Sequence, residues 1–113
     1  MEAPAQVERR YAPAVNRCIE SSGYGDAEIT ECYNLEFSVQ DGRLNQIFKM
    51  VLRRLPAVRK PVIKNGERAW IKTRDVVCQR HAAPEFSSTL HDVMLSSCLV
   101  NETVKCTMVL ENY

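Results

Sequence analysis

Residues 27–55, AEITECYNLEFSVQDGRLNQIFKMVLRRL, carry the longest helical pattern in the chain. Their apolar side chains recur at steps of three, four or seven, as on one face of a helix: Ile29, Tyr33, Phe37, Leu44, Ile47, Phe48, Val51 and Leu55. The alternation typical of a strand is absent. Asp26 is placed to cap the N-terminus and Pro56 to end the helix, while Gly42 is a candidate kink. The stretch therefore predicts one long helix.

Another helical segment follows this stretch. Pro61 suits a first helical position. Small or apolar residues then alternate at steps of three and four: Ile63, Gly66, Trp70, Thr73 and Val77. On this face Gly66 would meet a neighbouring helix and allow the two backbones to approach closely. The alternative is a turn at Asn65-Gly66, with the helix starting later.

Two more helices are expected at the ends of the chain. A short one around residues 12–22 closes on a Gly- and Ser-rich stretch. The last one extends through residues 90–108 after a Ser-rich loop, in which Ser87, Ser88 or Thr89 supplies the N-cap. Its connection to the preceding helix is short, so it should pack across the others.

The predicted fold is all-α. We expect a long antiparallel helical hairpin, a short N-terminal helix and a C-terminal helix packed across the hairpin, stapled by disulfides. With 113 residues, of which 45% are hydrophobic, the chain fits one domain over residues 1–113. Residues 1–11 are expected to be a flexible N-terminal segment.

The cysteines predict an oxidising compartment. Five are present, at Cys18, Cys32, Cys78, Cys98 and Cys106, and none of their spacings is that of a zinc knuckle. Widely spaced cysteines in a short chain indicate disulfides, and an odd number leaves one thiol over. No uninterrupted apolar run of about 18 residues is present, so no transmembrane segment is expected. The opening residues suit a periplasmic or extracellular bacterial protein whose signal peptide was replaced by Met1.

Residues 68–78, RAWIKTRDVVC, form the most specific motif, after Leu44-Asn45 and before Cys98-Leu99. In order and spacing these positions resemble the LprI-type lysozyme-inhibitor family over residues 18–110. The matching residues are Cys18, Cys32, Leu44, Asn45, Phe48, Ala69, Trp70, Ile71, Arg74, Asp75, Cys78, Cys98 and Leu99. Departures are Gly66, Cys106 and a missing glycine-rich loop after the third cysteine. The resemblance implies a helical, non-catalytic binding protein of the bacterial envelope.

The signature Asn45, Trp70, Arg74 and Asp75 is interpreted first as scaffold. Trp70, Arg74 and Cys78 lie four residues apart and share one helical face, so Trp70 can fill the core and Arg74 can pair with a carboxylate such as Asp75. The four family cysteines allow three pairings, among which sequence alone does not choose. Our expectation is Cys18–Cys32 with Cys78–Cys98, each closing a short loop worth about 3 kcal/mol, with Cys106 as a free, partly apolar thiol.

The net charge of +1 conceals a strong polarity. Residues 43–74 carry ten Lys or Arg and one acidic residue, whereas both flanking segments are acidic. The hairpin would gather at its turn a basic cluster of Arg53, Arg54, Arg59, Lys60 and Lys64. Such a cluster could enter the cleft of a lysozyme or another peptidoglycan hydrolase and neutralise its paired carboxylates, with Arg59 or Lys60 as the plug. Ordinary solvated helix charge is the plain alternative.

Other functions stay open. The cluster could instead contact anionic lipid headgroups or another acidic envelope protein, as an adaptor or an immunity protein would. An enzyme is disfavoured because His81 and His91 have no nucleophile placed by a recognisable motif. A zinc site from the two histidines with Cys78 and Cys98 is a minor alternative. We predict no cofactor, no metal and no nucleic acid as a partner.

Overall fold

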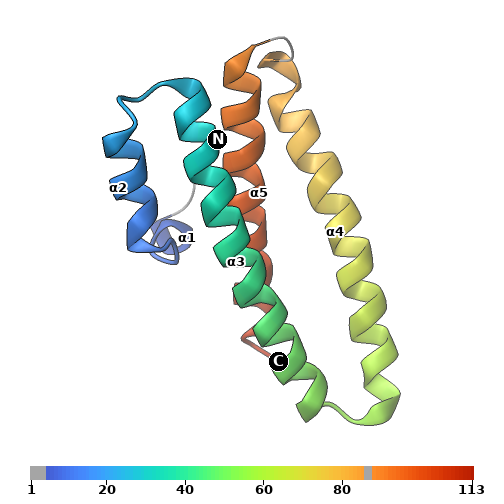
Figure 1. Cartoon of the computed structure of the whole chain (residues 1–113). Helices are drawn as coiled ribbons and strands as arrows, with labels where there is room; N and C mark the ends of the chain where they lie inside the picture. Colours follow the sequence, from blue (N-terminus) through green and yellow to red (C-terminus); the bar gives the residue numbers. More distant parts are fainter. Residues whose placement is uncertain (1–4, 86–87) are drawn as a thin grey trace.

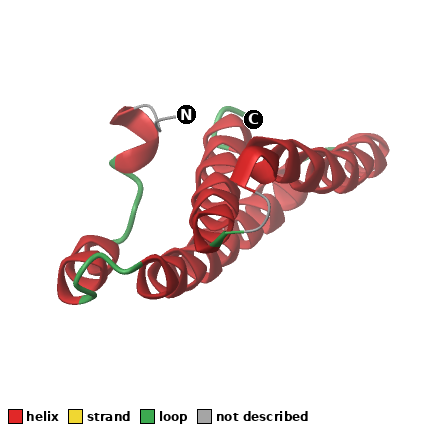
Figure 2. Cartoon of the chain, turned by 90° about the horizontal axis from the view of Figure 1, so that it is seen from above, coloured by secondary structure: helices red, strands yellow, loops and turns green. Residues whose placement is uncertain are grey.

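The computed structural model describes residues 5–85 and 88–113. These residues form five α-helices and two 3₁₀ turns (Figure 1): α1 Ala5–Glu8, α2 Pro13–Ser21, α3 Asp26–Arg54, η1 Ala57–Arg59, α4 Lys60–Ala82, η2 Ala83–Glu85 and α5 Thr89–Leu110. No strand occurs in the described ranges. The three long helices form a bundle about 49 Å long, and α1 and α2 lie on one side of it (Figure 2). The predicted all-α class is confirmed.

The long stretch is a single helix, α3, of 29 residues. Its backbone continues through Gly42. The expected N-cap is wrong by one position, because Gly25 is the cap and Asp26 is already helical. The Asp26 carboxylate instead accepts a hydrogen bond of 3.0 Å from the hydroxyl of Thr89, at the start of α5. At the other end Leu55 is the C-cap, directly before Pro56.

Helix α4 begins at Lys60 with Pro61 in its first turn, so the alternative of a turn at Asn65-Gly66 is wrong. The face predicted for it is displaced by about one residue. Its buried residues are Ile63, Cys78 and Ala82. Gly66 is exposed, and a Cβ added there would meet nothing within 4 Å, so the expected close helix approach at this glycine is also wrong.

Helix α5 is the central helix of the bundle. It contacts both α3 and α4, whereas α3 and α4 share few direct contacts among the described residues. Its buried residues are Ser96, Cys98, Val100, Thr103, Val104, Thr107 and Leu110. Three of these carry hydroxyls, and each donates to the carbonyl four residues earlier: Ser96 to Asp92 at 2.8 Å, Thr103 to Leu99 at 2.7 Å and Thr107 to Thr103 at 3.2 Å. Their burial therefore leaves no polar group unpaired.

The N-cap of α5 is Ser88, one of the three residues predicted for this position. The Ser88 side chain accepts from the backbone N–H of His91 at 3.3 Å, and Thr89 is the first helical residue. Ser87 lies outside the described residues.

By length and composition alone, α5 could also cross a membrane, since its mean hydropathy over 18 residues is 1.3. The sequence predicted no such helix. A core helix passes the same test, and α5 packs against α3 and α4. The expectation of no transmembrane segment therefore stays a prediction.

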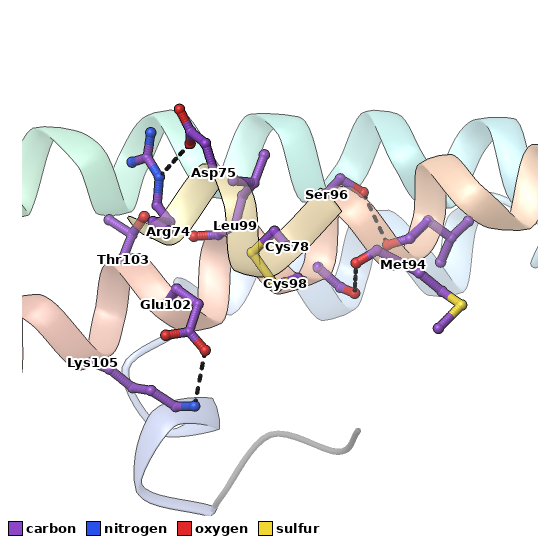
Figure 3. Close-up of a disulfide and its surroundings, with 12 residues drawn as sticks. Arg74, Asp75, Cys78, Met94, Ser96, Cys98, Leu99, Glu102, Thr103 and Lys105 are labelled. Atoms are coloured by element: carbon purple, nitrogen blue, oxygen red, sulfur yellow. Dashed lines mark hydrogen bonds and ion pairs between the residues drawn. A yellow bond between two sulfur atoms is a disulfide. The ribbon is translucent and has the colours of Figure 1, made fainter. Parts of the chain in front are cut away.

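Two disulfides form with the expected pairing. Cys18–Cys32 joins α2 to α3 with Cα atoms 5.7 Å apart, and Cys78–Cys98 joins α4 to α5 at 5.5 Å (Figure 3). Cys106 is the free thiol. Because Cys78 and Cys98 are bonded to each other, their thiolates are not free to bind zinc with the histidines.

The N-terminal segment is held by buried polar groups of α3. Glu36 and Gln40 are 3% and 1% exposed. The Glu36 carboxylate accepts from the backbone N–H of Ala12 at 2.6 Å, and the Gln40 amide donates to the carbonyl of Arg10 at 2.7 Å. Arg10 also forms an ion pair of 2.8 Å with Glu111, beyond the end of α5. The sequence predicts a flexible segment over residues 1–11 and did not indicate this packing.

Candidate partner-binding surface

The turn between α3 and α4 gathers the five predicted basic residues at one end of the molecule (Figure 1). Two stand in the last turn of α3, one ends η1 and two stand in the first turns of α4. In chain order these residues, here called the basic tip, are Arg53, Arg54, Arg59, Lys60 and Lys64. Lys60 is half-buried and the other four are exposed. No ion pair to any of them is found within the described ranges.

The turn itself presents its side chains to solvent. No residue of η1 is buried, and Val58 at its centre is 78% exposed. The turn is nonetheless regular, since the backbone N–H of Arg59 donates to the carbonyl of Pro56 at 2.9 Å. Pro56 has φ −57° and lacks an N–H, so it ends α3 and starts the turn. The result is a short cationic turn with an apolar side chain at its outermost point.

The charges of the basic tip suit one helix end and oppose the other. Cations are favourable at a helix C-terminus, where Arg53 and Arg54 stand. They are unfavourable at a helix N-terminus, yet α4 starts with Arg59 and Lys60 and has no acidic residue in its first turn. Arg59, as the N-cap, makes no side-chain capping hydrogen bond. Local rules broken in this way are expected at functional sites, so we regard the start of α4 as the strongest candidate in the tip.

The signature residues of α4 have structural contacts. The Arg74 guanidinium lies 5.2 Å from the ring centroid of Phe37 on α3 and 5.3 Å from that of Trp70. Its Nε donates to Asp75 at 3.0 Å, which confirms the expected ion pair (Figure 3). Arg74 thus connects α4 with α3, two helices that share few other contacts. Asn45, by contrast, is exposed on α3, so burial does not account for its place in the signature.

A second surface, which the sequence analysis missed, is a groove of about 390 Å³ between α4 and the C-terminal half of α5. Trp70 and Cys106 line it, and both pack against the core cluster formed by Leu44, Val51 and Leu110. Burial, together with the nearby charge of Glu67, raises the pKa of the Cys106 thiol to about 11. The only sequence signal for the groove was Gly66, which we had expected to close the helices together.

The two histidines lie on different helices, His81 on α4 and His91 on α5. His91 Nδ1 lies 3.2 Å from the carboxylate of Asp92, the next residue in the same helix turn. His81 is half-buried near the end of α4.

The model of a family described as lysozyme inhibitor LprI matches residues 18–110, which include both disulfides and the whole of α3, α4 and α5. The chain belongs to the LprI family. The resemblance inferred from the cysteines and the Trp-to-Cys motif is therefore confirmed. Comparisons with curated proteins and with solved structures found no significant match.

Membership has three consequences at a coarse level. The LprI family is an inhibitor family and generally non-catalytic, so it implies a protein as the binding partner. It is a family of the bacterial envelope or of secreted proteins. The two disulfides fit an oxidising compartment, in agreement with that location.

Proposed function

We propose that this protein inhibits a lysozyme or a related peptidoglycan hydrolase by stoichiometric binding, and that the basic tip is its contact surface. The observation that carries the proposal is the start of α4, where Arg59 and Lys60 stand without an ion-pair partner among the described residues and against the helix dipole. Membership of an inhibitor family supports the class of partner. The location we propose is the periplasm or the cell surface of a bacterium.

The chemistry of the target favours such a tip. Glycoside hydrolases cleave their substrate between two carboxylates that lie in a cleft. A narrow cationic projection can enter that cleft as the substrate does and contact the carboxylates. An Arg guanidinium can donate two parallel hydrogen bonds to one carboxylate, whereas the Lys ammonium group is a single charge on a flexible chain. Arg59 is therefore the first candidate for the group that meets a catalytic carboxylate, and Lys60 the second. Val58, almost fully exposed, would pack on the apolar wall of the cleft.

Binding would also relieve the local conflict at the start of α4. In the free protein the positive end of the helix dipole and the tip cations repel each other. A carboxylate of the target placed between them would interact favourably with both. The segments on either side of residues 43–74 are acidic, and their charge would steer a cationic lysozyme during its approach.

The test is peptidoglycan hydrolysis by a c-type lysozyme, titrated with this protein at low and at physiological salt. The variant Arg59→Glu/Lys60→Glu removes the proposed contact. Its matched control is Arg68→Glu/Lys72→Glu, which makes the same change in net charge at two exposed positions further along α4.

We expect inhibition that saturates at one equivalent, is retained by the control and is lost by the tip variant. Retention by both variants would keep the inhibitor and move its contact surface away from the tip. Equal loss in both variants would mean that overall charge, and no defined contact, governs binding. Absence of inhibition by the unaltered protein, with both disulfides formed, would refute the lysozyme target; salt-sensitive binding to anionic vesicles would then favour the lipid alternative.

A further inference from the structure

The groove between α4 and α5 has the composition of a binding site for an apolar group. Its walls carry Val62, Ile63 and Trp70 from α4 and Val109 and Leu110 from α5. Val62 and Val109 are 63% and 60% exposed, a large fraction for aliphatic side chains that sit together in a depression. Concave surfaces of a few hundred Å³ with mainly apolar walls are the usual form of small-molecule sites.

Two features keep the groove open. Gly66 forms part of the α4 wall without a side chain, and the space where its Cβ would stand is empty to 4 Å. Glycine costs the helix about 1 kcal/mol relative to alanine, and neither close packing nor a positive φ explains its presence here. The second feature is the presence of two small side chains, Cys106 and Val109, on the α5 side, where Lys105, Leu110 and Tyr113 also line the groove.

We propose that this groove binds the hydrocarbon chain of a single-chain anionic amphiphile, such as a long-chain fatty acid. The volume of about 390 Å³ sets the length of the chain. A methylene group occupies roughly the 30 Å³ that one water molecule takes in the liquid, so the groove accommodates about a dozen carbons. The aromatic ring of Trp70 and the thiol of Cys106 give such a chain largely apolar contacts, and the polar groups of Glu67, Lys105 and Tyr113 also line the groove.

The anionic headgroup follows from the charges around the groove. Arg59 and Lys60 precede Ile63 by one helical turn, so the α4 wall begins at the basic tip. Lys105 lines the α5 wall, where its Nζ lies 3.1 Å from Glu102. The acidic group in the groove is Glu67, which lies two helical turns further along α4 than Arg59 and Lys60; burial together with the charge of Asp41 raises its pKa. The headgroup would therefore lie at the end of the groove where α4 begins, next to the cations of the basic tip.

The test uses dodecanoate below the concentration at which it forms micelles, with the disulfide-bonded protein at neutral pH. Two native reporters line the groove: Trp70 is the chain's single tryptophan, and Cys106 is its single cysteine outside the two disulfides. Occupancy should shift the emission of Trp70 and slow the alkylation of Cys106. Dodecanol, equally long and uncharged, tests the need for the headgroup, and octanoate tests the need for chain length.

The decisive variant is Gly66→Leu, which fills the groove at a position where the helix gains stability from the change. Its matched control is Gly42→Leu on α3, where an added Cβ also meets nothing within 4 Å and no groove is lined. We expect dodecanoate to bind at one equivalent to the unaltered protein and to Gly42→Leu. In Gly66→Leu the affinity should fall by at least about tenfold, because several carbons of the ligand lose their apolar contacts.

The proposal is overturned if dodecanoate produces no saturable change at Trp70 and Cys106, or if Gly66→Leu binds dodecanoate as tightly as the unaltered protein. It is also overturned if Gly42→Leu loses as much affinity as Gly66→Leu. A dimer that Gly66→Leu dissociates would show that a second copy of the chain occupies the groove, which likewise overturns the proposal. Binding to anionic vesicles without binding of monomeric dodecanoate would also refute it. The lysozyme assay is independent of these results, because Gly66 lies outside the basic tip.

Discussion

Reversing the two charges at the start of α4 should stabilise the fold while it removes the proposed contact. In Arg59→Glu/Lys60→Glu, two cations at the positive end of the helix dipole become two anions. A charge in this position is worth about 0.3–1 kcal/mol, and exposed groups fall at the lower end. Arg59 is exposed and Lys60 is half-buried. Because the variant loses two repulsions and gains two attractions, we expect its free energy of unfolding to rise by about 1 kcal/mol in all.

The assay is thermal and urea denaturation of the disulfide-bonded protein at low salt. A gain of about 1 kcal/mol corresponds to about 4 °C in Tm for a domain of this size. In 1 M salt the Debye length falls to about 3 Å, so most of the gain should vanish. The control Arg68→Glu/Lys72→Glu lies away from the helix end and should show no such gain.

The opposite sign is expected at the neighbouring helix end. In Arg53→Glu/Arg54→Glu the C-terminus of α3 loses its favourable cations, so this variant should be less stable than the unaltered protein. The reasoning is refuted if the Arg59→Glu/Lys60→Glu variant is destabilised, or if its gain equals that of the control. Stabilisation combined with lost inhibition would show that the tip charges are kept at a cost to the fold.

Three further outcomes are expected. Replacing both cysteines of the Cys78–Cys98 bridge by serine should lower the free energy of unfolding by about 3 kcal/mol, measured in urea, because this bridge closes the turn between α4 and the central helix α5. In Glu36→Ala, the N–H of Ala12 loses its buried acceptor, so hydrogen exchange of that amide should accelerate and stability should fall by about 1–3 kcal/mol. Because its pKa is raised to about 11 from an ordinary 9.0, Cys106 should be alkylated about a hundredfold more slowly at pH 8 than an unburied thiol, and the rate should continue to rise above pH 9.

Local features of the fold were predictable from the sequence. The apolar period in α3, the proline at the start of α4 and the Ser88 cap each act within one or two helical turns, so the residues that form the pattern also form the structure. The pairing of the cysteines was one of three alternatives among which sequence alone did not choose, and the expected pairing, in which each bridge closes a short loop, is the one that forms. The clustering of the basic tip follows from the short turn alone, although its role in binding stays a prediction.

Long-range features needed the tertiary structure. Helical periodicity shows that a face is apolar but not which helix covers it, and here α5 separates most of α3 from α4. For the same reason Gly66 was expected at a close helix contact and instead lies in the wall of a groove. The polar residues Glu36 and Gln40 are buried only because residues 10–12 return to α3 and supply their hydrogen-bond partners. Sequence determined the helices and their family, and the packing of distant segments decided the core, the groove and the position of the N-terminal segment.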